Sequence, residues 1–178
     1  GLLTAVDPVF RDHVADDRDL APVDDDAPAA AKEEGPAANY ETVLDQAAFD
    51  RWLERLGAAD RFAFDTETDS LDYMRAGIVG VSFAISPGEA AYVPLTHDYP
   101  GAPDQLDRDA VLAALKPMLE DPDVEKLGHN LKYDAHVLQT HGVDLRGIGQ
   151  DTMLESYVLN STATRHDMDS VALKYLGV

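Results

Sequence analysis

Residues 61–68 read Arg-Phe-Ala-Phe-Asp-Thr-Glu-Thr, a segment in which side chains of different character alternate as they do along a β-strand. Successive side chains of a strand point to opposite faces, so the two phenylalanines share one face and the two acids, Asp65 and Glu67, share the other. Neighbouring carboxylates repel each other unless a cation or water screens them. The segment therefore predicts either a cation site or a solvent-exposed strand edge.

On both sides of this strand the sequence alternates between strand and helix patterns. Asp45 is placed to cap a helix that ends at Gly57, and Pro87-Gly88 is a hairpin signal between two apolar runs. The predicted strands cover residues 61–68, 78–85, 90–95 and 124–127, and the predicted helices cover residues 45–57, 107–119, 131–141, 152–159 and 169–176. Hairpin pairing followed by strand–helix alternation predicts an α/β fold, with a mixed β-sheet flanked by helices.

Residues 1–38 differ in composition from the rest of the chain. They hold ten acidic and three basic residues, and residues 21–38 are mainly Ala, Pro and acids. Such a segment buries too little apolar surface to offset its ordering entropy, so we expect a flexible linker. The apolar residues near the start could end a preceding domain, and the chain, which lacks an initiator Met, is expected to be a fragment. Residues 39–178 are the predicted domain.

The overall composition excludes several classes of protein. The 178 residues carry a formal net charge of −20 and include no Cys, which excludes disulfides and thiol chemistry. No run of 18 apolar residues exists, so we expect no membrane span. We further expect a cytoplasmic monomer. Acidic surfaces repel nucleic acid, although clustered carboxylates that hold divalent ions can still act on phosphates.

A second informative segment covers residues 127–138. Asn130 is a plausible N-cap for the helix that follows, and Asp134 then shares a helix face with the apolar residues Leu131 and Leu138. A buried carboxylate is costly without a partner, so Asp134 is either a ligand or an ordinary helix residue at the edge of the apolar stripe.

The three acids Asp65, Glu67 and Asp134 suit hydrolysis of phosphodiesters by two metal ions. Mg²⁺ prefers hard oxygen ligands of this kind, whereas Zn²⁺ prefers His or Cys. The His residues are scattered along the chain, and the spacing of His129 to Asp134 is interpreted as coincidence. We expect His129 to line a cleft or to be exposed.

Several segments resemble one known family. Residues 62–72 resemble the first motif of the 3′→5′ proofreading exonuclease domain of bacterial DNA polymerase I, and residues 130–134 (Asn-Leu-Lys-Tyr-Asp) resemble its second motif. Residues 151–157 and 165–170 are also similar to that domain, so the likeness covers about residues 40–178.

The resemblance implies an RNase H-like exonuclease fold and the removal of mispaired nucleotides from a primer end in DNA replication and repair. It implies that Asp65, Glu67 and Asp134 are catalytic and hold two Mg²⁺ or Mn²⁺ ions. The implied partners are the single-stranded 3′ end of DNA and a polymerase domain of the same parent chain.

The resemblance also implies contacts with the substrate. Leu71 would press on the terminal base, and the other implied contact residues are Thr66, Asn130, Tyr133 and Arg165. The residues themselves allow simpler roles: Leu71 in the core, Asn130 as a cap, Tyr133 in packing and Arg165 in a surface ion pair.

One element of the family pattern is missing. The family has a third motif, Tyr-x3-Asp, which supplies a fourth carboxylate, but no Tyr in this sequence is followed four residues later by Asp. We therefore expect a C-terminally incomplete domain with weak metal binding and little or no turnover of its own. Two alternatives stay open: an exoribonuclease of the RNase D type and a non-catalytic scaffold domain of a polymerase.

Overall fold

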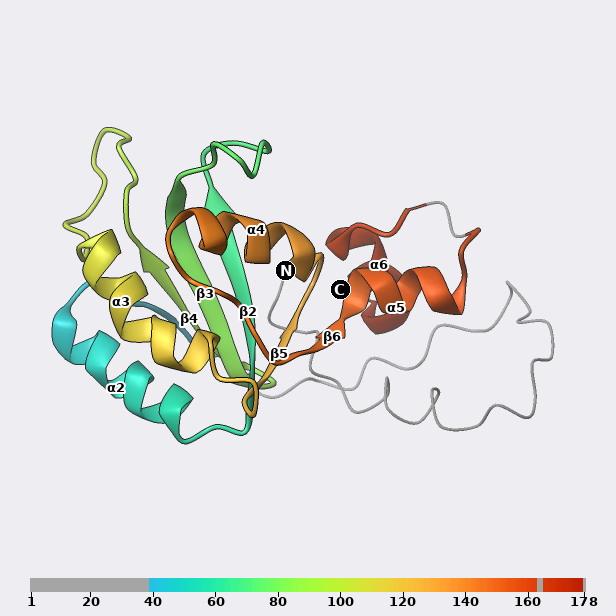
Figure 1. The fold of residues 1–178 in the computed structure, drawn as a ribbon. Coiled ribbons are helices and arrows are strands. Elements are labelled where there is room, and N and C mark those ends of the chain that lie inside the picture. Colours follow the sequence, from blue (N-terminus) through green and yellow to red (C-terminus); the bar gives the residue numbers. More distant parts are fainter. Residues whose placement is uncertain (1–38, 163–164, 178) are drawn as a thin grey trace.

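The computed structural model describes residues 39–162 and 165–177, which form one mixed β-sheet with helices packed on it (Figure 1). The strands are β1 (Asn39–Thr42), β2 (Arg61–Thr68), β3 (Ile78–Ser86), β4 (Glu89–Pro94), β5 (Glu125–Gly128) and β6 (Ile148–Asp151). The helices are α2 (Gln46–Gly57), α3 (Arg108–Leu119), α4 (Leu131–Thr140), α5 (Thr152–Leu159) and α6 (Met168–Leu176). The predicted α/β class is confirmed.

The strands lie in the order β1-β4-β3-β2-β5-β6. β2, β3 and β4 pair antiparallel, as the hairpin signal predicts, whereas β1 pairs parallel with β4 and β5 pairs parallel with both β2 and β6. The two edge strands β1 and β6 were not predicted, because each has only four residues and neither shows apolar alternation.

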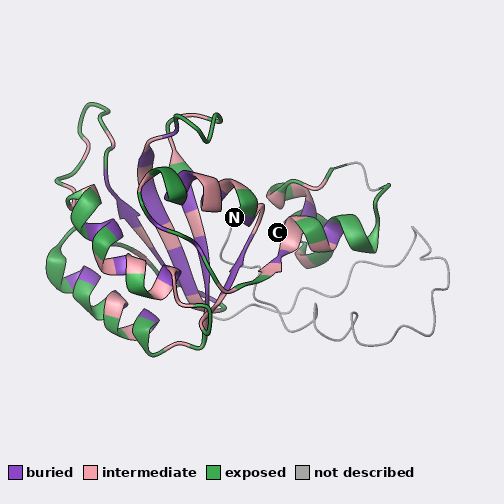
Figure 2. Ribbon diagram, viewed as in Figure 1, coloured by how far each residue is buried: buried purple, intermediate pink, exposed green. Residues whose placement is uncertain are grey.

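The apolar core lies between the sheet and the helices α2, α3 and α4, which cover the same face (Figures 1 and 2). The face of β2 that carries Phe62 and Phe64 turns toward this core, as the alternation predicts. The largest core side chains are Trp52, Phe49, Phe62, Phe64 and Phe83. The opposite face carries the small residues Ala63, Ala84 and Ala90, against which Met168 of α6 packs.

Four helices begin at an Asp whose side chain accepts a backbone N–H: α2, α3, α5 and α6. Asp45 Oδ1 accepts from Ala48 N at 2.8 Å, and Asp107 Oδ1 accepts from Ala110 N at 2.8 Å, as predicted. Asp167 caps α6, two residues before the predicted start of that helix. Pro117 lies in the last turn of α3, yet the helix continues to Leu119.

The expected cap of α4 is wrong. Asn130 has φ 64° and makes no side-chain capping bond; instead Asp151 accepts from Asn130 N at 3.0 Å and from Leu131 N at 2.9 Å. The same carboxylate accepts from Met153 N and Leu154 N at the start of α5. One Asp at the end of β6 thus closes two helix N-termini, and Asn130 adopts a left-handed conformation that Asn tolerates well.

Within the residues that the structure describes, no helix is both long enough and apolar enough to cross a membrane. The predicted linker, residues 1–38, lies outside the described residues.

Candidate active site

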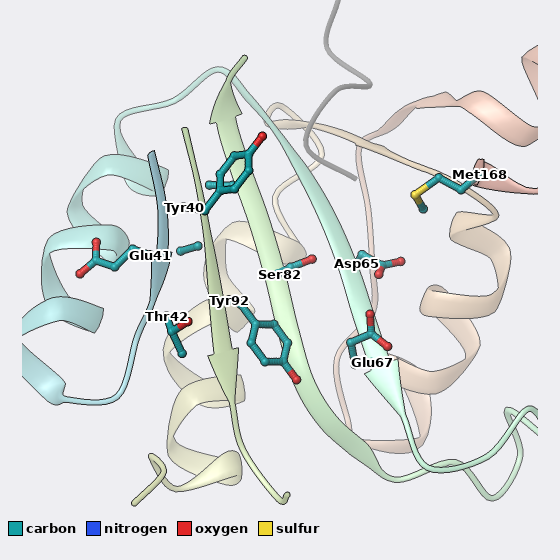
Figure 3. A pocket seen from close by; sticks show the side chains of 10 residues that line it. Tyr40, Glu41, Thr42, Asp65, Glu67, Ser82, Tyr92 and Met168 are labelled. Carbon is teal, nitrogen blue, oxygen red and sulfur yellow. The ribbon is translucent and has the colours of Figure 1, made fainter. Parts of the chain in front are cut away.

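Asp65 and Glu67 lie on the sheet face opposite the main core, at the side of a cavity of about 300 Å³ (Figure 3). Their placement follows from strand alternation, because Thr66 between them faces the other way. Asp65 lies opposite Ser82 of β3, and Ser82 lies opposite Tyr92 of β4. Asp65 therefore ends a row of polar side chains that crosses three strands.

Asp134 approaches β2 from α4, which packs on the core face of the sheet. Its Oδ1 accepts two hydrogen bonds from Thr66, one from the backbone N at 2.9 Å and one from Oγ1 at 2.7 Å. The pairing of β2 with β5 extends only from Arg61 to Ala63, so the edge of β2 next to Thr66 has no strand neighbour on that side. The carboxylate of Asp134 occupies this position, with only 2% of the residue exposed.

The electrostatics show that these acids influence one another. Burial, together with the negative charges of Asp134 and Glu67, raises the pKa of Asp65 to about 7. Burial also raises the pKa of Asp134 to about 6, although the hydrogen bonds from Thr66 oppose this shift. A neighbouring cation would relieve both the burial cost and the mutual repulsion.

The three predicted ligands are not gathered into a ready metal site. Across residues 39–162 and 165–177, no group of three or more His, Cys, Asp or Glu side chains is arranged to hold a metal ion. Asp65 and Glu67 share a face, whereas Asp134 bonds to Thr66 at the strand edge. The donor chemistry nevertheless fits Mg²⁺ or Mn²⁺, because the acids supply hard oxygen atoms.

Two of the predicted substrate contacts, Leu71 and Tyr133, meet at the loop between β2 and β3. Leu71 is 94% exposed in the loop between β2 and β3, which excludes the alternative of a core residue. The hydroxyl of Tyr133 hydrogen-bonds to the Ser70 carbonyl at 2.6 Å and to Thr68 Oγ1 at 2.7 Å, so Tyr133 supports this same loop. The side chain of Asn130 is not used for capping.

Two predicted contacts are occupied by other partners. Thr66 is buried, and both its N–H and its hydroxyl donate to Asp134, so it holds Asp134 rather than facing the cavity. Arg165 forms an exposed ion pair with Asp167 at 2.8 Å, which is the simpler role considered for it.

His129 is not directed at Asp134. Its Nδ1 lies 2.9 Å from Thr152 Oγ1, and its Nε2 is buried without a hydrogen-bond partner among the described residues. Burial lowers the pKa of this His, although the charge of Asp151 opposes that shift. His129 is half-buried rather than exposed, and a position in a cleft stays a prediction. The interpretation of its spacing to Asp134 as coincidence agrees with this geometry.

Tyr92 also lines the cavity with Glu67, although it was not among the predicted site residues (Figure 3). Its hydroxyl lies 2.6 Å from His97 Nε2, and burial together with the charge of Glu67 raises its pKa. The ring covers Gly80, where an added Cβ would meet the Tyr92 hydroxyl oxygen at 2.1 Å. A Gly inside a strand often marks such a close approach, and Gly80 was the available signal.

Comparisons with known proteins place this arrangement in a family. DNA polymerase I of Pseudomonas aeruginosa is 64% identical over 141 residues, which cover 78% of this chain and 15% of that protein. DNA polymerase I of Rhizobium leguminosarum is 41% identical over 155 residues, again covering 78% of this chain and 15% of the relative. The chain thus spans about one seventh of the length of these curated relatives.

Solved structures share the fold at low sequence identity. The polymerase domain of Pol1 from M. smegmatis, in complex with DNA primer-template and dNTP, matches 77% of this chain and 22% of its own, with a TM-score of 0.61 and 23% identity. RNase D of Escherichia coli matches 79% of this chain and 34% of its own, with a TM-score of 0.55 and 18% identity. The fold is that of the RNase H-like exonucleases.

A family model described as 3′-5′ exonuclease matches residues 40–178. This match and the identities to the two relatives agree with the resemblance seen in the motifs. The chain belongs to the 3′-5′ exonuclease family of DNA polymerase I.

Proposed function

We propose that this chain is the proofreading portion of a DNA polymerase I, and that it hydrolyses the terminal phosphodiester of a primer strand in DNA replication and repair. One observation carries the proposal: Asp65 and Glu67 share one cavity, and Asp134 bonds to the Thr66 that separates them. Carboxylates held this close at the end of one strand repel each other, and this repulsion costs free energy unless they bind a cation.

Asp65, Glu67 and Asp134 would hold Mg²⁺ or Mn²⁺, with two ions in the complete site. Bound ions of this kind activate a water molecule and stabilise the leaving oxygen of the phosphodiester. Thr66 contributes by fixing Asp134 through Oδ1, which leaves the second carboxylate oxygen, Oδ2, for another ligand.

The single-stranded 3′ end of the DNA would enter beside the loop of residues 69–77. Leu71 is exposed there and can press on the terminal base, while Tyr133 supports the loop from α4. Asn130 and Arg165 complete the proposed contacts with the strand, and Arg165 would have to exchange its ion pair with Asp167 for a phosphate.

The parent enzyme is proposed to carry a polymerase domain and a Tyr-x3-Asp motif outside the present 178 residues. Residues 1–38 are proposed to act as a linker and residues 39–178 as part of the nuclease domain. A cytoplasmic monomer stays a prediction. Because the fourth carboxylate is missing from the sequence, we expect the chain alone to bind metal weakly and to turn over slowly.

Calorimetry with Mn²⁺ tests the metal site. We expect binding to the wild-type chain and at least tenfold weaker binding to Asp65→Asn, with the exposed residue Asp98→Asn as the matched control. Equal heats from the wild type and Asp65→Asn would support the scaffold alternative, because no ion would then depend on this carboxylate.

The substrate class needs a separate assay. Because the fold is shared with RNase D, an exoribonuclease is the second candidate function. The complete parent enzyme is incubated with Mg²⁺ and end-labelled single strands of DNA or RNA with the same sequence. Faster release of mononucleotides from DNA is expected, and faster release from RNA would replace the proposed substrate.

A further inference from the structure

The loop of residues 69–77 leaves β2 directly after the acidic pair and returns into β3. Its two ends are tied together, because Gly77 N donates to Asp69 Oδ1 at 2.8 Å and Asp69 N donates to the Gly77 carbonyl at 3.1 Å. Within the loop, Asp72 Oδ1 accepts from Met74 N at 3.1 Å. The loop therefore has a closed neck and an internal turn, but these bonds alone do not set its position against the rest of the molecule.

Two contacts with α4 set that position. The hydroxyl of Tyr133 hydrogen-bonds to the Ser70 carbonyl at 2.6 Å, and the ring of Tyr73 stacks on the ring of His136 with centroids 4.7 Å apart and an interplanar angle of 21°. Tyr133 and His136 are three residues apart, so they lie on the same face of the helix. The loop is thus attached to α4 at Ser70 and again at Tyr73.

Leu71 lies between these two attachments. An apolar side chain that is 94% exposed gains nothing from its own burial, so its direction depends on the backbone on either side. The first attachment immediately precedes Leu71, and the second follows it by two residues. Removing either one would allow the exposed segment to pivot about the other.

We infer that Tyr73 and His136 form a positioning pair, whose stacking holds Leu71 in place against the terminal base of a single-stranded 3′ end of DNA. The inference rests on the proposed function, and it adds two residues that act through Leu71 rather than on the substrate. If the side chain that meets the base is already fixed, the loop loses less conformational entropy when the strand binds. A mobile loop would have to become ordered at that moment, which would weaken binding.

The first test measures the anchoring without any substrate. Arg75 is exposed, but Ala76, the next residue, is buried, so trypsin can cut between them only after a local opening of the loop. Release of the loop from α4 would favour that opening. We expect His136→Ala to speed the cut at this bond about fivefold, as followed by mass spectrometry, because one aromatic contact is lost. Tyr73→Phe keeps the stack and should keep the wild-type rate, and the exposed Gln139→Ala on the same helix is the control.

The second test measures binding of a fluorescent single strand whose 3′ linkage is a phosphorothioate, with Mg²⁺ present. We expect Tyr73→Ala and His136→Ala each to weaken binding several-fold. Tyr73→Phe, which keeps the aromatic ring, should bind the strand as tightly as the wild type. In a Leu71→Ala chain, His136→Ala should have no additional effect, because the pair acts through Leu71.

Equal trypsin rates for the wild type and both alanine variants would overturn the inference. Losses of affinity that simply add to that of Leu71→Ala would also overturn it, since the pair would then contact the strand independently. If the wild-type chain binds no strand, the proposed function fails, and the trypsin rates still decide whether Tyr73 and His136 anchor the loop. Thermal melts of each variant confirm that the chain remains folded.

Discussion

Asp65 shows how a proposed metal ligand weakens the fold that holds it. Its pKa is about 7 in the folded chain against an ordinary value of 3.8, because burial and the charges of Asp134 and Glu67 disfavour the carboxylate. The folded chain therefore binds more protons than the unfolded chain between these values. The resulting contribution to stability is complete below about pH 4 and is lost as the pH rises through about 7.

We predict that Asp65→Asn raises the melting temperature of the metal-free chain at pH 8, because it removes a partly buried charge. The gain should shrink toward pH 5, where Asp65 in the wild type is mostly protonated. Thermal unfolding in the presence of a chelator at both pH values measures the difference. A wild type that is as stable as the variant at pH 8 would contradict the raised pKa.

Thr66 is the second residue whose role can be measured. Thr66→Val removes the hydroxyl that donates to Asp134 Oδ1 and leaves a buried carboxylate with one fewer partner. We predict a loss of about 1–3 kcal/mol in the free energy of unfolding and a weaker affinity for Mn²⁺. Thr66→Ser keeps the hydroxyl and serves as the control, so an equal loss in both variants would point to packing instead.

At the scale of the secondary-structure elements, Asp151 joins β6 to the starts of α4 and α5. Its carboxylate accepts N–H groups from both helices, whereas Asp45 accepts one N–H at the start of α2. Each capped N-terminus typically contributes about 1 kcal/mol. The link also fixes where α4 begins, and with it the position of Asp134.

We predict that Asp151→Ala lowers the free energy of unfolding by about 2 kcal/mol or more, roughly twice the effect of Asp45→Ala, because two helices lose their cap. Urea unfolding of both variants makes the comparison. Metal affinity should also fall in Asp151→Ala but not in Asp45→Ala, since only α4 carries a proposed ligand. Equal effects of the two substitutions on both measurements would contradict this role.

At the scale of the whole molecule, the net charge of −20 opposes contact with a phosphate backbone. We predict that binding of a single strand requires a divalent cation and is abolished by a chelator. So acidic a chain would neutralise few phosphates and release few counterions from the DNA, so affinity should fall only weakly as monovalent salt rises. Fluorescence anisotropy between 50 and about 200 mM salt, with and without a chelator, measures the cation requirement and the salt dependence. Tight binding without divalent ions would contradict the prediction and would reveal a basic surface despite the negative net charge.

Much of this protein could be predicted from local sequence patterns. The alternation of residues 61–68 predicts both the strand and the shared face of Asp65 and Glu67, because neighbouring side chains of a strand must diverge. Asp45 and Asp107 predict helix starts, because capping is a contact over three residues. The motifs further predict the family, which the comparisons confirm.

The tertiary structure alone decided the contacts between distant residues. The bond from Thr66 to Asp134 spans 68 positions, and it exists because β5 leaves the edge of β2 free where α4 begins. The capping of α4 by Asp151 and the stacking of Tyr73 on His136 likewise depend on how elements pack. Periodicity reports which face a residue occupies, but only the packing of strands and helices determines which faces meet.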